Sequence, residues 1–357
     1  MIPGFLRDGN FVIMNYQHSF HAGNFADVLK HAVLVSVLPS FHQKETPFCF
    51  IDTHAGAGCY DITAVPAQKT GEAKEGILKL LAAQFVPAAP ATPADQNPQN
   101  SQNSQEFSLA HQNKITRVPL ALKNYFDLVQ KAQIDPTTAL SDLHKITQYP
   151  GSPWLADMFC RAQDEIILNE LHSETCRLLK RQFSSRDNVF VHQQDAYEFM
   201  SSVLPPIKIK RGLVLIDPPF ERRDEEHAIA HALEKAHHVF PHGMYMIWFP
   251  LTRKHPVFNP TPKLQAVLRS PRWLGKKLSL NFRIKALSAG SMGSMGSRGA
   301  ISSMNYLNGD VLEEKGLIGS QLIIINPPYQ LKDKLKTLMP YLMNVFAKDA
   351  GANWHLE

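Results

Sequence analysis

The sequence lacks the features that mark membrane-spanning proteins and disulfide-stabilised secreted proteins. It has only four cysteines in 357 residues, Cys49, Cys59, Cys160 and Cys176, and no two of them form a C-x-x-C pair. No segment approaches the roughly 18 consecutive apolar residues of a membrane helix. We therefore predict reduced thiols and a cytoplasmic protein without membrane association.

Charged residues are also scarce, and neither sign dominates. They make up 19% of the chain against 44% hydrophobic residues, with a net charge of +5. This composition is typical of a globular protein with a sizeable core, and its small basic excess is only weak support for a polyanionic partner. Polar residues interrupt the apolar N-terminus, so we predict no signal peptide. Met14 is a candidate native start, with residues 1–13 a loose extension.

Metal-ligand spacing is absent as well, although the chain has sixteen histidines. They cluster at 18–21, at 231 and at 237–242, without cysteines or carboxylates at a recognisable ligand spacing. We interpret them as surface or core residues and predict no metal site.

Seven short apolar runs predict an α/β fold. They cover residues 47–52, 165–170, 188–195, 212–217, 243–250, 278–287 and 320–326. Helix-period segments such as 153–163 and 174–183 separate most of them, which predicts a seven-stranded, mostly parallel sheet covered on both faces. A further helix is predicted at 24–38, where Asn24 can accept a hydrogen bond from a free backbone N–H at the helix start.

Two segments interrupt this alternation. Residues 61–149 are predicted as a small helical insertion, with a disordered loop near 87–105 that is rich in Pro, Ala, Gln, Asn and Ser. The predicted main domain therefore comprises residues 14–60 and 150–345. The Ser-Met-Gly repeats at 288–304 predict a flexible loop between the last two strands.

A glycine turn follows the first predicted strand, in Asp52-Thr-His-Ala-Gly-Ala-Gly58. Glycines at a strand end let the backbone approach a ligand closely. The turn lacks the G-x-G-x-x-G spacing of dinucleotide sites, which argues against NAD. An acid followed by x-G-x-G is typical of Rossmann-like methyltransferases, with His54 here in place of the usual first glycine. The alternative is a plain turn with a structural histidine.

Acids also end the next two predicted strands. Glu170 is placed where a doubly wound fold meets the ribose hydroxyls of a nucleoside, and Asp195 where a carboxylate can accept from an adenine amino group. Either acid alone is more simply a capping residue. Three acids at three successive strand ends, with Asp52 the first, favour a nucleoside cofactor.

Asp217-Pro-Pro-Phe220 ends the fourth predicted strand. An exocyclic amine is a poor nucleophile, so a site must hold both its hydrogens with acceptors. The carboxylate of Asp217 and a backbone carbonyl fixed by proline offer them, and Phe220 can stack on a base extruded from its strand. The alternative is a simple Pro-Pro strand terminator.

A second motif, Asn326-Pro-Pro-Tyr329, matches the amino-methyltransferase pattern equally well by its letters. Strand order favours Asp217, because Asn326 follows the seventh predicted strand. Ser152-Pro153 precedes the helix that leads into the second strand. We predict Ser152 as its N-cap and Pro153 as its first residue, which brings Ser152 back to the glycine turn.

The chain resembles the bacterial 23S ribosomal RNA adenine-N6 methyltransferases that modify A2030. The resemblance runs from about Tyr16 to about residue 345, and its motifs occur in order: Tyr16-x-His18-Ser-Phe-His-Ala-Gly-Asn24, Asp27-Val-Leu-Lys30-His31, Asp52 to Gly58, Tyr149-Pro-Gly-Ser-Pro153, Glu170-Leu-His172, Leu-Ile-Asp-Pro-Pro-Phe220 and Ile-Asn-Pro-Pro-Tyr329.

The resemblance implies a Rossmann-like class I methyltransferase domain with a helical insertion. It implies S-adenosyl-L-methionine as cofactor, S-adenosyl-L-homocysteine as product and 23S ribosomal RNA as partner. The implied cofactor contacts are His31, His54, Ser152, Glu170, Asp195, Ala196 and Asp217. Asp217 is the implied catalytic acid, and Tyr16 the implied substrate contact. His18 and Lys30 share its motif and are candidates for the same role. Phe220 stands where the family has tyrosine.

We therefore expect direct methyl transfer to a flipped adenine, by a monomer and without a metal. Two alternatives stay open. Enzymes with related Pro-Pro-aromatic motifs methylate DNA adenine or a protein glutamine. A catalytically inactive methyltransferase fold could also serve as an RNA-binding module.

Overall fold

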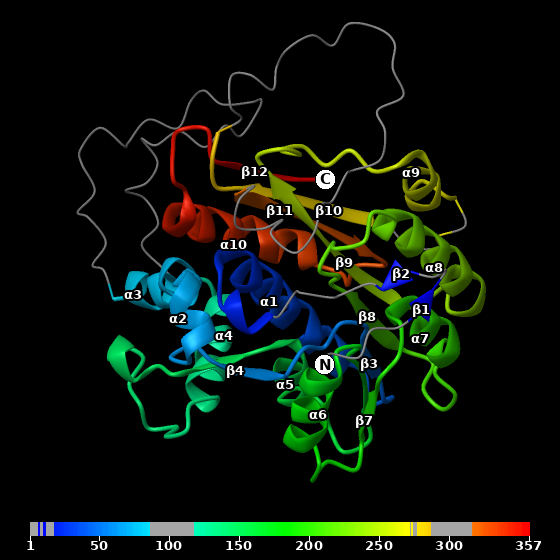
Figure 1. Cartoon of the computed structure of the whole chain (residues 1–357), viewed down its shortest axis with the longest axis horizontal. Coiled ribbons are helices and arrows are strands. Elements are labelled where there is room, and N and C mark those ends of the chain that lie inside the picture. Colours follow the sequence, from blue (N-terminus) through cyan, green and yellow to red (C-terminus); the bar gives the residue numbers. More distant parts are fainter. Residues whose placement is uncertain are drawn as a thin grey trace, which may run out of the picture.

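An eight-stranded sheet forms the centre of the computed structural model (Figure 1). The structure describes residues 18–85, 118–271, 273, 277–286 and 316–357, and the backbone of the two-stranded pair β1 (Leu6–Arg7) and β2 (Asn10–Phe11). The main sheet has the order β12-β10-β11-β9-β8-β3-β6-β7. Its strands are β3 (Cys49–Asp52), β6 (Glu165–Asn169), β7 (Val189–His192), β8 (Gly212–Ile216), β9 (Met244–Thr252), β10 (Lys277–Arg283), β11 (Leu317–Ile325) and β12 (Asn353–Leu356).

The predicted count of seven strands is wrong by one. The additional strand is β12, which pairs with β10 and lies after residue 345, where the predicted domain ended. β12 has four residues, of which none is fully buried. A segment this short and this weakly apolar carries no clear strand signal, and only the exposed edge of β10 gives it a pairing partner.

Strand direction divides the sheet into two parts. β7, β6, β3, β8 and β9 pair parallel to one another. β11 is antiparallel to β9, and β10 and β12 continue antiparallel pairing to the edge. The carboxyl ends of the five parallel strands therefore meet at one edge of the sheet, the edge that runs across the strand ends. β11 runs the other way and ends at the opposite edge.

Two groups of helices cover the sheet. α1 (Phe25–Val37) contacts α5 (Ser152–Asp157), α10 (Leu331–Phe346) and β11. α8 (Glu225–Val239) packs between α7 (Ala196–Val203) and α9 (Pro262–Leu268), and α6 (Ser173–Gln182) packs on β7. No helix in the described part of the chain is long and apolar enough to cross a membrane.

α1 is the most deeply buried helix near the parallel strand ends. The predicted cap is confirmed: the side chain of Asn24 accepts hydrogen bonds from the N–H groups of Ala26 and Asp27. Twelve of the thirteen residues of α1 are buried, including Asp27, Lys30 and His31. α1 lies between the sheet and the helices of residues 61–149. Its polar side chains therefore need hydrogen-bond or ion-pair partners inside the protein.

The segment 61–149 leaves and rejoins the main fold at one place. β4 (Cys59–Asp61) pairs with β5 (Gln148–Pro150), and the N–H of Gly151 donates to the carbonyl of Gly58 at 2.8 Å. Between them lie α2 (Val65–Thr70), α3 (Lys79–Ala83) and α4 (Leu120–Lys131), and α4 packs on α1. The β4–β5 pair returns the chain to the glycine turn, directly before Ser152. The predicted loops at 87–105 and 288–304 lie outside the described residues.

Candidate active site at the parallel strand ends

Four of the predicted acids lie at the same edge of the sheet. Asp52 is the last residue of β3, Glu170 and Asp217 directly follow β6 and β8, and Asp195 follows β7 by three residues. Because β7, β6, β3 and β8 are parallel neighbours, their carboxyl ends are adjacent. Ligands of open α/β sheets bind outside such strand ends.

Asn326-Pro-Pro-Tyr329 lies at the other edge, because β11 runs antiparallel to β9. The side chain of Asn326 donates to the carbonyls of Pro241 and Gly243, at 2.9 and 2.8 Å, directly before β9. Tyr329 is 89% exposed. The motif therefore ties the end of β11 to the start of β9, far from the cluster of acids.

Asp217 belongs to a partly buried chain of ionisable side chains. The ammonium group of Lys30, on α1, bonds the Oδ2 atom of Asp217 and, at 3.0 Å, the Oδ1 atom of Asp27. The imidazole of His18 lies 2.9 Å from the other oxygen of Asp27. Burial disfavours the charge on Lys30, but the carboxylates of Asp217 and Asp27 outweigh it and raise the pKa of the ammonium. The predicted residues Lys30 and His18 are thus linked to Asp217, whereas Tyr16 lies outside the described residues.

Phe220 follows β8 as predicted, but its ring is buried. Its ring is 1% exposed and packs edge-on against Trp248, with ring centroids 5.8 Å apart, and beside Phe249 at 5.7 Å. A buried ring offers no free face, so the predicted stacking on a base does not occur in this conformation. The backbone of Phe220 has φ of 53°, a left-handed conformation that costs a non-glycine residue about 1–2 kcal/mol.

The carboxylate of Asp52 is fully buried and organises the start of the glycine turn. It accepts from the hydroxyl of Ser152 at 2.6 Å and from the N–H of His54 at 3.1 Å. Burial raises the pKa of Asp52 to about 7, although both hydrogen bonds work against the rise. The predicted cap role of Ser152 is wrong: Gly151 is the N-cap of α5 and Ser152 its first residue. The reason is that Asp52 takes the hydroxyl of Ser152.

Two left-handed glycines shape the rest of the turn, Gly56 with φ of 62° and Gly58 with φ of 85°. The N–H of Gly56 donates to Glu170 at 3.0 Å, and the other oxygen of Glu170 accepts from the N–H of His172 at 2.8 Å. Burial raises the pKa of Glu170 against these two hydrogen bonds. A Cβ atom at Gly56 would lie 1.9 Å from the hydroxyl of Tyr60, so the turn has no room for a side chain there.

His31 and His54 differ in accessibility. His31 is 2% exposed, and its Nδ1 lies 2.7 Å from the hydroxyl of Tyr149, which in turn accepts from Tyr125 of α4. Burial, helped by the charge of Lys30, lowers the pKa of His31 to about 3, so the ring is neutral. His54 is half-buried and lies 2.8 Å from the hydroxyl of Thr53. For His31 to contact a cofactor as predicted, the residues packed around α1 would have to move apart.

Asp195 is both a capping acid and an ion-pair partner. Its Oδ1 accepts from the N–H groups of Tyr197 and Glu198, the second and third residues of α7, and its Oδ2 accepts from Arg222 at 3.1 Å. Arg222 also lies over the ring of Tyr197, 5.7 Å from its centroid. Ala196 is the first residue of α7, and a helix-initial N–H has no acceptor within its own helix.

Sequence reasoning missed Asn169, which joins three strand ends. The residue is 1% exposed, and its amide donates to the carbonyls of Thr53 and Gln194, at 3.1 and 3.0 Å. Its oxygen accepts from the N–H of Gln194 at 3.0 Å. Asn169 thereby holds the ends of β3 and β7 against β6. An asparagine inside an apolar strand, one residue before Glu170, was the available signal.

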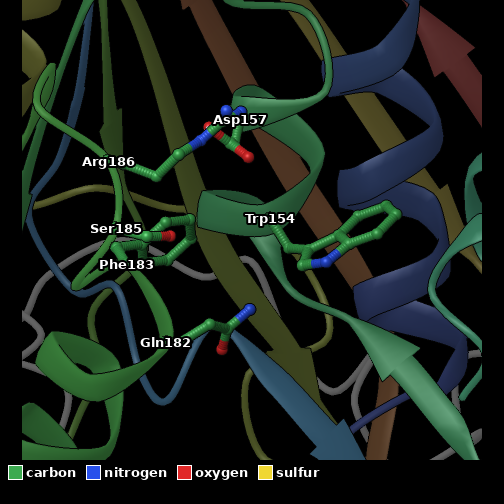
Figure 2. A pocket seen from close by; sticks show the side chains of 6 residues that line it. All are labelled: Trp154, Asp157, Gln182, Phe183, Ser185 and Arg186. Atoms are coloured by element: carbon green, nitrogen blue, oxygen red, sulfur yellow. The ribbon is translucent and has the colours of Figure 1, made fainter.

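A pocket of about 280 Å³ lies elsewhere (Figure 2), lined by Trp154, Asp157, Gln182, Phe183, Ser185 and Arg186. Figure 2 shows the side chain of Arg186 reaching Asp157, with which it forms an ion pair at 2.6 Å. Ser185 and Arg186 precede the start of β7, so this pocket extends toward the edge opposite the acids. In the described part of the chain, no group of three or more His, Cys, Asp and Glu side chains could hold a metal ion.

The chain is similar to proteins named as ribosomal RNA large subunit methyltransferases. The family model described as "Ribosomal RNA large subunit methyltransferase D, RlmJ" matches residues 45–95 and 99–270. Two similar proteins are each named ribosomal RNA large subunit methyltransferase J. The Haemophilus influenzae protein is 29% identical over 97% of this chain and 98% of its own, and the Escherichia coli protein 27% identical over 92% and 93%. A Legionella pneumophila crystal structure is 26% identical, with a TM-score of 0.65 over 94% of this chain and 98% of its own.

Proposed function

Since the chain belongs to the RlmJ family of ribosomal RNA large subunit methyltransferases, we propose that it transfers a methyl group from S-adenosyl-L-methionine to N6 of an adenine in 23S ribosomal RNA. The target expected from the resemblance is A2030. The observation that carries the proposal is the position of Asp217-Pro-Pro-Phe220, at the end of β8 and next to the glycine turn that ends β3. A ribosomal RNA substrate implies a cytoplasmic enzyme, and we assume a monomer.

The residues at the sheet edge fit this cofactor by their chemistry. Glu170 keeps lone pairs for the two ribose hydroxyls, because each of its oxygens accepts only one backbone hydrogen bond from the described residues. The N–H of Ala196 can donate to a ring nitrogen, and Asp195 can accept from the amino group. Asp52, Ser152 and His54 would surround the methionine end. S-adenosyl-L-methionine, when bound, supplies an electrophilic methyl group on a positively charged sulfur.

Asp217 would orient the amine of the target base. In the described part of the chain, Lys30 engages Oδ2 only, which leaves Oδ1 to accept one amine hydrogen. The carbonyl of Pro218 can accept the second, since the following proline restricts the backbone at this position. The nitrogen lone pair then points away from the ring plane toward the methyl group. Methyl transfer would form the C–N bond while breaking the C–S bond, would release S-adenosyl-L-homocysteine and would need no covalent enzyme intermediate. The extra proton on nitrogen passes to Asp217.

The test is Asp217→Ala with labelled S-adenosyl-L-methionine and 23S ribosomal RNA from cells that lack the gene. We expect methyl transfer to fall at least 100-fold, in line with the loss of a group that orients the nucleophile. Asn326→Ala is the matched control, because it alters the same type of motif at the opposite edge. An Asp217→Ala protein that methylates at the wild-type rate would sink the assignment.

The substrate class is tested separately. Labelled methyl transfer into total RNA, DNA and protein distinguishes the proposed reaction from methylation of DNA adenine or a protein glutamine. Calorimetry with S-adenosyl-L-methionine distinguishes it from RNA binding by an inactive fold, which predicts no cofactor affinity. Mapping of N6-methyladenosine in 23S ribosomal RNA, with and without the gene, identifies the target base.

A further inference from the structure

Trp248 lies beside Asp217 in the sheet. The β8–β9 register pairs Leu215 with Met246 and Ile216 with Ile247, so its next step places Trp248 opposite Asp217. Paired residues of neighbouring strands point to the same face. Tyr245 points toward α8, where its hydroxyl donates to the carbonyl of Phe240. Trp248 is three residues further along β9, so its side chain points to the opposite face of the sheet. On that face the ammonium group of Lys30, on α1, bonds the carboxylate of Asp217.

The indole N–H of Trp248 is buried without an acceptor among the described residues. The side chain is 8% exposed. On its other flank β11 places Leu322, which is apolar and fully buried, and the ring of Phe220 packs against the indole edge-on. Buried N–H groups nearly always have a partner, so one without a partner, next to a proposed reaction site, marks a place where an acceptor is supplied from outside.

The ring of Phe220 packs against the indole of Trp248, and the backbone of Phe220 has an unfavourable conformation. Its φ of 53° belongs to a region that aromatic residues rarely occupy, and its ring fills the space beside the indole. Rotation of Phe220 away from Trp248 would open a flat space bounded by an indole N–H and by the carboxylate of Asp217. Such a space would present one donor and one acceptor to an incoming ring.

We propose that Trp248 is a substrate-positioning residue whose indole N–H donates a hydrogen bond to a ring nitrogen of the target adenine. The inference rests on the proposed function and specifies how the base is read. Adenine carries an amine donor next to a ring-nitrogen acceptor on both of its hydrogen-bonding edges, N1 on one and N7 on the other. Asp217 and Trp248 complement that pair. Guanine presents a carbonyl oxygen in place of the amine and is rejected by the carboxylate.

The experiment is a double-mutant cycle between protein and RNA. Wild-type protein and Trp248→Phe, which keeps an aromatic ring but removes the N–H, are assayed on RNA with adenosine, 1-deazaadenosine or 7-deazaadenosine at the target. We expect Trp248→Phe to lower kcat/KM on adenosine about tenfold, as for the loss of one buried hydrogen bond. One deaza substrate should lower kcat/KM of the wild-type protein similarly, and the two losses should not multiply. Affinity for S-adenosyl-L-methionine should be unchanged.

Three outcomes overturn the inference: multiplied losses on both deaza substrates, an unchanged kcat/KM for Trp248→Phe, or an equal loss of cofactor affinity. If Trp248→Phe does not fold, β-(3-benzothienyl)alanine at position 248 keeps the bicyclic shape without the N–H and takes its place. If the wild-type protein methylates the adenosine RNA but the losses in kcat/KM from Trp248→Phe and from the deaza substrates multiply, this inference alone is wrong. A wild-type protein that methylates no RNA defeats the proposed function as well.

Discussion

Replacing the buried imidazole of His31 should change how the stability of the protein depends on pH. Burial, together with the nearby charge of Lys30, lowers the pKa of His31 to about 3 in the folded protein. In the unfolded chain an imidazole titrates near 6.5. Between these two values the unfolded state binds a proton that the folded state does not. Stability is therefore lost as the pH falls below the unfolded pKa.

The size of the effect follows from the two pKa values. At pH 5 the unfolded imidazole has gained a proton over about 1.5 pH units, which corresponds to about 2 kcal/mol of lost unfolding free energy. At pH 7.5 the corresponding loss is near zero. A glutamine at position 31 removes this loss but keeps a polar group for the hydroxyl of Tyr149. His31→Gln should therefore cost about 2 kcal/mol less stability at pH 5 than at pH 7.5.

Urea unfolding of wild-type protein and His31→Gln at both pH values measures this difference. Tyr149→Phe is the matched control, because it removes the same hydrogen bond without removing the imidazole. Its effect on unfolding free energy should be similar at the two pH values. Equal destabilisation by His31→Gln at pH 5 and pH 7.5, or greater destabilisation at pH 5, would refute the reasoning.

Three further predictions, tested with four substitutions, concern the parallel strand ends, the segment 61–149 and the motif at Asn326. Asn169→Leu should lower the unfolding free energy by about 2–4 kcal/mol, because it leaves buried backbone groups unpaired, and calorimetry should show weaker binding of S-adenosyl-L-methionine. Gly76→Ala should cost about 3 kcal/mol or more in thermal or urea unfolding, because its Cβ would lie 1.9 Å from a backbone oxygen, whereas Gly71→Ala, with open space but φ of 66°, should cost only about 1 kcal/mol. Asn326→Ala should lower stability by about 1–2 kcal/mol while methyl transfer per folded molecule stays unchanged, and a loss of activity would contradict the separation of the two motifs.

The sequence was informative where one strong local pattern determined the structure. The apolar runs located the strands of the parallel half of the sheet to within a few residues, and Asn24 marked the start of α1. The acids at the strand ends needed no knowledge of distances, since parallel strands bring their carboxyl ends together. Periodicity and capping chemistry act within a few residues, so one sequence is enough to recognise them.

The misses all depend on partners distant in the chain. Ser152 has the chemistry of a cap, but Asp52, 100 residues earlier, takes its hydroxyl. Phe220 has a stacking face, but Trp248 and Phe249 cover it. β12 exists because β10 offers it an unpaired edge. None of these contacts leaves a local trace, because each is set by how the elements pack.

The ends of the sheet also bear on how the protein behaves in concentrated solution. In the described structure the eight-stranded sheet begins and ends with four-residue strands, β12 at one side and β7 at the other. A sheet edge invites pairing with other chains when it is long and flat, and short edge strands limit that template. Without β12, the seven-residue edge of β10 would be left unpaired, with Leu280 and Phe282 on one face. A protein shortened before Asn353 would therefore be prone to edge-to-edge aggregation, even with every residue of the candidate site intact.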